Sequence, residues 1–175
     1  ASCLVGSEMC IRDSIGTISS FGHQLEFDLE KGFPAVTTKS LAWKGVVSEL
    51  LWFLEGSDDE RRLAEIRFQK NREELTDLDK FSTIWTDNAE NQGKALGYDN
   101  NQTKKILGPV YGVQWRNWTG IDQVKELLTN IKENPNSRRH ILSAWNVGEL
   151  DKMALPPCHV TVSYTHLRAH ETRGN

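Results

Sequence analysis

Leu155-Pro156-Pro157-Cys158-His159 is the stretch around which the rest of the sequence is organised. Each proline fixes its own backbone φ and disfavours a helical conformation in the residue before it, so the cysteine follows a stiff, non-helical approach. The next three residues, Val160-Thr161-Val162, are β-branched, which favours a strand. The sequence therefore predicts a thiol at the point where a loop enters a strand.

An arginine pair stands upstream of this thiol, in Ser137-Arg138-Arg139, directly before a largely apolar run, Ile141-Leu142-Ser143-Ala144-Trp145. Two guanidiniums could hold an anion, and a cysteine can act as a nucleophile, so together they suit chemistry on a phosphorylated substrate. Each feature also has a simpler interpretation. A single cysteine is most often a small buried hydrophobe, and an arginine pair is usually a solvated face.

The amino-acid sequence of residues 137–159 as a whole favours the functional interpretation. Residues 137–146, Ser-Arg-Arg-His-Ile-Leu-Ser-Ala-Trp-Asn, and residues 150–159, Leu-Asp-Lys-Met-Ala-Leu-Pro-Pro-Cys-His, closely resemble the thymidylate synthase family. The resemblance implies an α+β fold, a mixed β-sheet with flanking helices, in one half of an obligate homodimer. It also implies a methyltransferase that converts dUMP to dTMP with 5,10-methylenetetrahydrofolate as co-substrate and with no metal.

The chemistry of that reaction explains why a cysteine is needed. Carbon 5 of uracil is not nucleophilic enough until a group adds to carbon 6, and a thiolate can add there and leave again. By resemblance, Cys158 is this nucleophile, while Arg138 and Arg139 reach across the dimer interface to the partner's nucleotide phosphate. Tyr111 lies in a further family match, residues 108–116, and is expected to bind substrate. His159 is expected to be a structural neighbour rather than the base.

Two other family-like segments concern proton transfer and folate. Glu49 lies in a run that is apolar almost all round, so its carboxylate either reaches solvent or is buried; the resemblance implies that it faces the active site and orders water. Ile84 and Trp85 look like the segment that contacts folate. The residues after them are Thr86-Asp87-Asn88, whereas many family members have an acidic residue and a second tryptophan here. The stacking of folate on this segment is therefore expected to differ from that in those members.

Composition bounds the remaining possibilities. The chain has 175 residues, 38% of them hydrophobic, which fits one domain with a core. A formal net charge of −3 gives no reason to expect nucleic acid or an anionic membrane as partner. No apolar run approaches the roughly 18 residues of a membrane span. Cys3 and Cys10 have no metal-finger spacing, so a reducing, cytoplasmic setting is expected.

The periodicity predicts the main elements. Residues 17–29 end in apolar–polar alternation and predict a half-buried strand. A helix is expected from a cap at Ser40 to Gly56, and a second one from a capping box at residues 57–60. Residues 121–131 have helical spacing, and residues 140–145 predict a strand.

The ends of the chain differ from the rest. Residues 1–14 and 163–175 show no structural period and are expected to be non-native flanks around a partial family domain, residues 15–162. Arg12 falls in register with the family's N-terminal phosphate-binding arginine but lies in the first flank. The chain itself is therefore expected to be inactive. Two alternatives stay open: a deoxypyrimidine-nucleotide hydroxymethylase of the same family, which uses water in place of hydride, and a non-enzymatic fragment.

Overall fold

The computed structural model describes residues 8–10, 17–19 and 22–164. The chain divides into two units, residues 1–41 and residues 42–175, and each is described by itself. Arg12 lies outside the described residues, so its expected phosphate contact stays a prediction. Within the described residues, no helix is both long and apolar enough to cross a membrane.

The first unit contains one strand pair and one short helix. Strand β1, Glu8–Cys10, pairs antiparallel with β2, Thr17–Ser19. The 3₁₀ helix η1, Leu29–Lys31, is capped by the side chain of Asp28. The strand predicted for residues 17–29 is therefore wrong over residues 22–29. Alternation produces a half-buried strand only where a neighbouring strand pairs with it, and none of the described strands pairs with residues 22–28.

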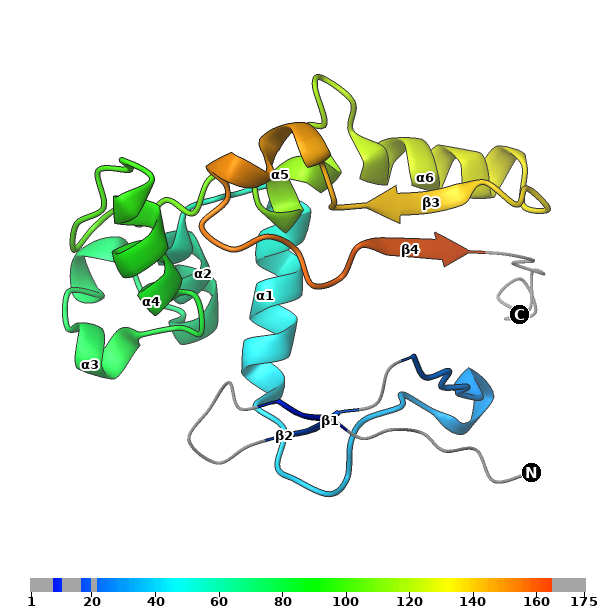
Figure 1. The fold of residues 1–175 in the computed structure, drawn as a ribbon, viewed down its shortest axis with the longest axis horizontal. Helices are drawn as coiled ribbons and strands as arrows, with labels where there is room; N and C mark the ends of the chain where they lie inside the picture. Colours follow the sequence, from blue (N-terminus) through cyan, green and yellow to red (C-terminus); the bar gives the residue numbers. More distant parts are fainter. Residues whose placement is uncertain (1–7, 11–16, 20–21, 165–175) are drawn as a thin grey trace. The chain divides into compact units, whose positions relative to one another are not determined.

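The second unit is built on helix α1, Trp43–Glu55 (Figure 1). The helix ends as predicted at Gly56, whose left-handed conformation lets its N–H donate to the carbonyl of Phe53. Its start was predicted wrongly. The N-cap is Ala42, which offers no side-chain acceptor, whereas Ser40 lies outside the helix. Backbone N–H groups of Gly45 and Val46 instead bond the carbonyl of Ala42.

A group of short helices follows α1. These are α2, Glu60–Phe68; η2, Arg72–Glu74; α3, Leu78–Phe81; α4, Thr86–Asn88; and a single π-helical turn η3, Ala89–Gly93. Asp59 caps α2 by accepting the N–H of Arg61, and Ser57 accepts the N–H of Asp59. The predicted capping segment thus does start the helix, with Asp59 rather than Ser57 as the cap. Packing against α2 gives these helices a small core of Ala64, Leu75 and Phe81.

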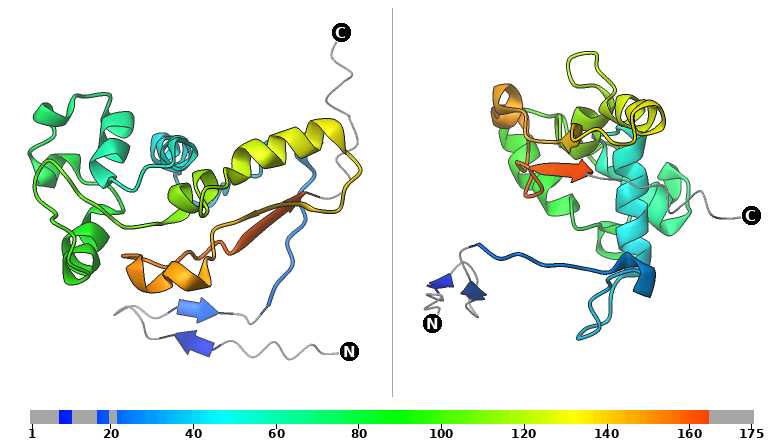
Figure 2. Two further views of the ribbon diagram at one scale, coloured as in Figure 1. Left: turned by 90° about the horizontal axis from the view of Figure 1, so that it is seen from above. Right: turned by 90° about the vertical axis from the view of Figure 1, so that its right-hand side faces the viewer.

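The rest of the unit carries the second strand pair. Helix α5, Tyr111–Arg116, packs on α1, and α6, Gln123–Glu133, packs on β3, His140–Ser143. Figure 2 shows α6 running alongside β3. After η4, Val147–Lys152, strand β4, Thr161–Tyr164, pairs antiparallel with β3, with Leu142 opposite Val162. The helix predicted near residues 121–131 is confirmed as α6. The strands predicted at residues 140–145 and after Cys158 are confirmed as β3 and β4, with ends shifted by a few residues.

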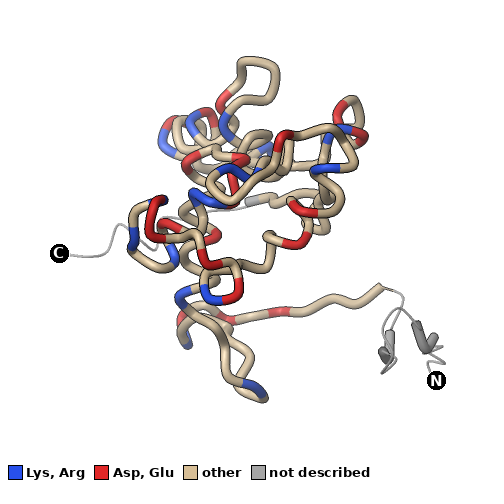
Figure 3. The backbone as a smooth tube through the Cα atoms, turned by 90° about the vertical axis from the view of Figure 1, so that its left-hand side faces the viewer, with Lys and Arg blue, Asp and Glu red and all other residues tan. Residues whose placement is uncertain are grey.

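The main core joins α1, α5 and the segment before Cys158. Its buried members come from distant parts of the chain: Trp52, Phe53, Leu63, Trp85, Ala89, Leu107, Val110, Tyr111, Ala144, Met153 and Ala154. The centre is aromatic, and such rings dominate the apolar area that a core removes from water. Basic and acidic residues are interspersed along this unit (Figure 3), so the described part has no long run of one sign.

Candidate active site around Cys158

One tyrosine hydroxyl accepts two hydrogen bonds from the backbone of the Cys158 loop. The backbone N–H of Cys158 donates to Oη of Tyr111 at 2.6 Å, and that of His159 donates to the same oxygen at 3.1 Å. Upstream, the N–H of Ala154 bonds the carbonyl of Leu107 at 2.8 Å. Pro157 is buried, while Cys158 is exposed and carries a free thiol. The predicted stiff mount is thus present, and it presents the thiol to solvent.

Tyr111 is itself held by aromatic packing. Its ring stacks on Phe53 with 4.8 Å between ring centroids, and it meets Trp85 and Trp115 edge-on at 6.1 and 6.3 Å. The side chain is buried, with 4% of its surface exposed. Expected as a substrate-binding residue, Tyr111 in this chain accepts hydrogen bonds from the loop that carries Cys158.

Gly112 explains how α5 comes close enough to α1 for this packing. A Cβ added at Gly112 would lie 2.7 Å from the carbonyl oxygen of Phe53 and 2.9 Å from its Cα. Any larger residue would therefore push the two helices apart. The close approach places Tyr111 directly on the ring of Phe53.

Glu49 faces a cavity rather than open solvent. Its Oε1 accepts the indole N–H of Trp85 at 2.6 Å, a short, charge-assisted hydrogen bond. Glu49 is half-buried on α1 and lines a cavity of about 160 Å³. The remaining lining residues are Ala42, Gly45, Val46, Ser48, Leu63, Arg67, Thr83 and Ile84. Of the two interpretations of this carboxylate, the inward-facing one agrees with the structure.

The two residues expected to contact folate occupy different positions. Ile84 is 74% exposed and lines the Glu49 cavity, whereas Trp85 is 5% exposed and lies in the aromatic core. Trp85 therefore reaches the cavity through its hydrogen bond to Glu49. Ile84 provides the apolar surface that a ligand would touch.

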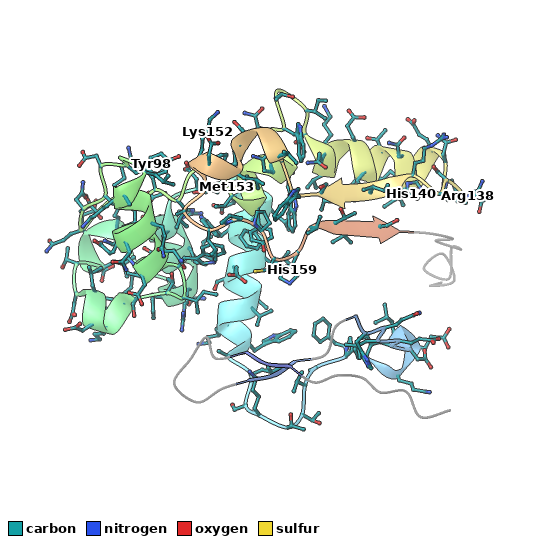
Figure 4. All side chains as sticks on the ribbon, in the orientation of Figure 1. Tyr98, Arg138, His140, Lys152, Met153 and His159 are labelled. Carbon is teal, nitrogen blue, oxygen red and sulfur yellow. The ribbon has the colours of Figure 1, made fainter. Side chains whose placement is uncertain are left out.

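The arginine pair lies away from Cys158 in the same chain. Arg138 and Arg139 are exposed in the turn between α6 and β3, where the N–H of Arg139 donates to Oγ of Ser137. In Figure 4, Arg138 lies at the outer end of β3, well removed from His159. Cys158, Tyr111, Glu49, Ile84 and Trp85 thus gather around the aromatic core and the cavity beside it, and the two arginines do not join them.

The family model for thymidylate synthase matches residues 4–172. The chain belongs to the thymidylate synthase family.

Phage proteins are among its relatives. The chain is 53% identical over 156 residues to the probable thymidylate synthase of Escherichia phage T5, covering 89% of this chain and 52% of that protein. It is 49% identical over 155 residues to the thymidylate synthase of Enterobacteria phage T4, covering 89% and 50%. The crystal structure of the T4 phage enzyme superposes with a TM-score of 0.78 at 45% identity, covering 95% of this chain and 54% of that one. The chain therefore spans about half the length of these relatives.

The thymidylate synthase-like α+β fold predicted from the sequence is confirmed by this likeness. Both strand pairs among the described residues are antiparallel. The boundaries predicted at residues 14 and 163 stay predictions, because the flanks lie mostly outside the described residues.

Sequence reasoning missed a buried ion pair that supports the segment carrying Ile84 and Trp85. Glu60 and Arg61 are both fully buried and pair bidentately, Nε to Oε2 and Nη2 to Oε1, each at 2.7 Å. Oε1 of Glu60 also accepts the hydroxyls of Thr83 and Thr86, the residues that bracket Ile84 and Trp85. A buried pair of this kind is tolerated only when its hydrogen bonds are complete. Its charged residues resemble a solvated helix start, so nothing in the sequence marked them as buried.

A second missed cluster ties α5 to η4. Nε2 of Gln114 donates to Glu149 at 2.8 Å and to the carbonyl of Pro109 at 2.9 Å, and Nδ2 of Asn146 donates to Oε1 of Gln114 at 3.0 Å. The Gln114 hydrogen bond, with a smaller contribution from Lys152, holds the pKa of Glu149 below its ordinary value. Near this cluster, the hydroxyl of Tyr98 donates to the carbonyl of Lys152 at 2.7 Å. Figure 4 labels both residues.

The described residues offer no cluster suited to a metal ion. No group of three or more His, Cys, Asp and Glu side chains among them is placed to hold one.

Proposed function

We propose that this chain carries the nucleophile of a thymidylate synthase, which methylates dUMP to dTMP with 5,10-methylenetetrahydrofolate as donor of carbon and hydride. The observation that carries the proposal is the exposed Cys158 thiol on a backbone fixed by two hydrogen bonds to Tyr111. About 50% identity to phage proteins named as thymidylate synthases supports it. The activity is a proposal because the chain spans about half the length of those proteins.

In this proposal Cys158 adds to carbon 6 of the uracil ring. Electron density then moves to carbon 5, which becomes nucleophilic enough to attack the one-carbon unit of the folate. Loss of the carbon-5 proton and cleavage of the bond between the one-carbon unit and the folate nitrogen leave a methylene group on carbon 5. Hydride from the tetrahydrofolate then reduces this group to methyl while the thiolate departs from carbon 6, which restores the uracil ring and leaves dihydrofolate. A fixed backbone on both sides of Cys158 restricts the positions of Sγ, which lowers the entropic cost of the first step.

Glu49 is proposed to order the water that moves protons at the base. Trp85 occupies Oε1 and fixes the plane of the carboxylate. No donor among the described residues occupies Oε2, which leaves it for water in the cavity. A carboxylate held in this way can accept and return protons without leaving its position.

The nucleotide phosphate is proposed to bind Arg138 and Arg139 of a second copy of the chain. Both guanidiniums are exposed at the outer end of β3, away from their own Cys158. The strand pair also exposes the apolar side chains of Ile141 and Val162, as does Val160 just before β4, and a homodimer would cover them. We propose that the same contact brings the arginines to the partner's site; Arg12 is proposed as a further phosphate ligand.

The folate is proposed to lie against Ile84 at the Glu49 cavity, with no metal ion taking part. The nucleophile has to stay a free thiol, so a reducing compartment, the cytoplasm, is the proposed location.

A specific observation favours a second candidate function, the non-enzymatic fragment. In this interpretation the chain alone does not convert dUMP. Helix α1 exposes Val46, Leu50, Leu51 and Leu54 to between 38% and 51% of their surface. Apolar side chains in such a row are usually covered in a folded enzyme. We therefore propose that residues 1–175 by themselves form no dTMP.

The experiment compares the chain with a chimera that continues it after Val162 with the matching remainder of the T4 phage enzyme. We expect dTMP formation by the chimera, none by the chain alone, and none by the Cys158→Ala chimera, with dihydrofolate absorbance as the readout. Mass spectrometry should find a covalent adduct with 5-fluoro-dUMP on the chimera and not on its Cys158→Ala variant. An adduct that survives the substitution removes Cys158 from the mechanism.

A further inference from the structure

A continuous line of hydrogen bonds runs from the start of α2 to the Glu49 carboxylate. At one end, Oε1 of Glu60 accepts the hydroxyls of Thr83 and Thr86, each at 2.7 Å. Oγ1 of Thr83 accepts the backbone N–H of Trp85 at 3.2 Å. The indole N–H of Trp85 then donates to Oε1 of Glu49 at 2.6 Å. We call this set of contacts the Glu60–Glu49 line.

The two threonines of the line also fix each other. The backbone N–H of Thr83 donates to Oγ1 of Thr86 at 2.8 Å. Each hydroxyl therefore donates to Glu60 and accepts one backbone N–H, so turning either side chain would break two hydrogen bonds at once. Both threonines are buried, where an unmade hydrogen bond is costly. Segment 83–86 is thus held in one conformation.

The Glu60 end of the line is itself fixed. Arg61 donates to both carboxylate oxygens of Glu60 at 2.7 Å. Its guanidinium also donates to the carbonyls of Leu75 and Phe81, each at 3.2 Å. Glu60 and Arg61 are fully buried, and hydrogen bonds in such a low-dielectric environment are stronger than in water. The ion pair is therefore a rigid point to which segment 83–86 is attached.

We propose that Glu60 and Arg61 are positioning residues for Glu49. They fix segment 83–86, and through it the Trp85 indole that selects one orientation of the Glu49 carboxylate. Glu60 and Arg61 are not among the residues that line the Glu49 cavity, so they act on it through this segment. The inference rests on the proposed function, because the proton transfer assigned to Glu49 gives the position of its carboxylate a chemical consequence.

Hydrogen exchange of indole N–H groups tests whether the line holds Trp85. Isotope-labelled full-length 1–175 is followed by NMR, with Trp85→Phe and Trp52→Phe used to assign the two signals. Trp52 is the internal reference, because its indole lies in the same core and donates to the carbonyl of Asp59 instead of to the line. Thr83→Val removes the hydroxyl between Glu60 and Trp85. It should raise the ratio of Trp85 to Trp52 exchange about tenfold.

Further variants separate the hydrogen bonds from packing. Thr83→Ser keeps the hydroxyl and should keep the exchange ratio near that of the unchanged chain. Thr86→Val should raise the ratio by a smaller factor, because it releases the backbone of Thr83. Glu60→Gln should raise it too; if this variant does not fold, because Arg61 stays buried without a counter-charge, the threonine variants still decide. Thr103→Val, in an exposed loop, is the matched control and should change nothing.

Turnover by the chimera supplies the functional readout. Thr86 is not among the lining residues of the Glu49 cavity, so its substitution removes no contact made there. Thr86→Val should lower kcat and kcat/KM for dUMP by a similar factor, roughly fivefold, as expected when an interaction of the transition state is weakened. Thr86→Ser should recover most of the loss.

Three results would overturn the inference. One is rapid exchange of the Trp85 indole in the unchanged chain. Another is an equal rise of Trp52 and Trp85 exchange in Thr83→Val, which a network that only stabilises the fold would give. The third is a raised exchange ratio in Thr86→Val with unchanged kcat. Failure of the proposed function is distinguishable, since the unchanged chimera would then form no dTMP while exchange in 1–175 still reports on the line.

Discussion

At the scale of single residues, the Tyr111 hydroxyl connects the core to the Cys158 loop. Replacing Tyr111 with Phe keeps the ring on Phe53 and removes the acceptor of two backbone N–H groups. Each N–H left without a partner costs about 1–3 kcal/mol where water cannot replace it. We therefore expect Tyr111→Phe to lower the free energy of unfolding by about 1–3 kcal/mol in urea titrations.

Hydrogen exchange locates the effect. The amides of Cys158 and His159 should exchange faster in the Tyr111→Phe variant, while those of α6 should not change. Tyr98→Phe is the matched control, because that hydroxyl donates to the carbonyl of Lys152 and does not contact the Cys158 loop. Unchanged exchange at Cys158 in Tyr111→Phe would show that the hydroxyl does not hold the loop.

The local sequence was enough to predict the role of some of these residues, whereas the contacts of others depend on distant parts of the chain. Two prolines beside Cys158 predict a rigid mount from backbone stereochemistry alone, and the mount is there. Tyr111 could be assigned to the site but not to its partner, since that partner is a backbone 47 residues away. Arg61 could not be predicted as buried, because its burial depends on carbonyls of Leu75 and Phe81 that only the fold brings to it.

At the scale of secondary-structure elements, local sequence signals predicted where helices begin and end better than they predicted which strands pair. Gly56 ends α1 because its left-handed conformation is a local property of glycine. Residues 24–29 alternate as a strand does, yet strand formation needs a neighbouring strand, and no described strand supplies one. Helices α2 and α6 both begin at an aspartate whose side chain caps the first turn, which a sequence can reveal.

The contact between α1 and α5 gives a second prediction. In Gly112→Ala the new methyl group would meet the backbone of Phe53 at 2.7–2.9 Å, so the helices have to separate. Overpacking of this kind costs about 1–3 kcal/mol, and we expect a loss of that size in thermal or urea unfolding. Gly45→Ala in α1 is the control: its methyl group would meet only Cβ of Ala42 at 3.8 Å.

The control should change stability in the opposite direction. An alanine in a helix interior loses less backbone entropy on folding than a glycine, so Gly45→Ala should stabilise the chain by about 0.5–1 kcal/mol. Equal effects of the two substitutions would show that the approach of α5 to α1 is looser than the geometry indicates.

At the scale of the whole molecule, the residues proposed for the site lie in places that one chain does not bring together. Cys158 lies by the aromatic core, while Arg138 is at the outer end of β3 (Figure 4). His140, the next buried residue of that strand, has no hydrogen-bond partner on either ring nitrogen among the described residues, so it does not anchor the arginine turn. In the proposed two-fold dimer the arginines of one copy reach the cysteine of the other, and the symmetry would complete both sites in the same way.

Mixing of two inactive chimeras tests this arrangement. One carries Cys158→Ala and keeps its arginines; the other keeps Cys158 and carries Arg138→Ala and Arg139→Ala. Each homodimer should be inactive or nearly so, but a heterodimer joins the intact cysteine of the second chain to the intact arginines of the first. With random exchange, half of the dimers are heterodimers with one complete site each, so about one quarter of the unmodified chimera's activity should return.

The measurement is dihydrofolate absorbance after subunit exchange, with native mass spectrometry to count heterodimers. Heterodimers that form without recovery of activity would place the arginines in the same chain's site or outside any site. The matched control replaces the arginine variant with Lys125→Gln, whose homodimer should be fully active before mixing. After exchange with the Cys158→Ala chimera, that mixture should keep about half of the activity, since half of its sites lack the nucleophile whichever chain supplies the arginines.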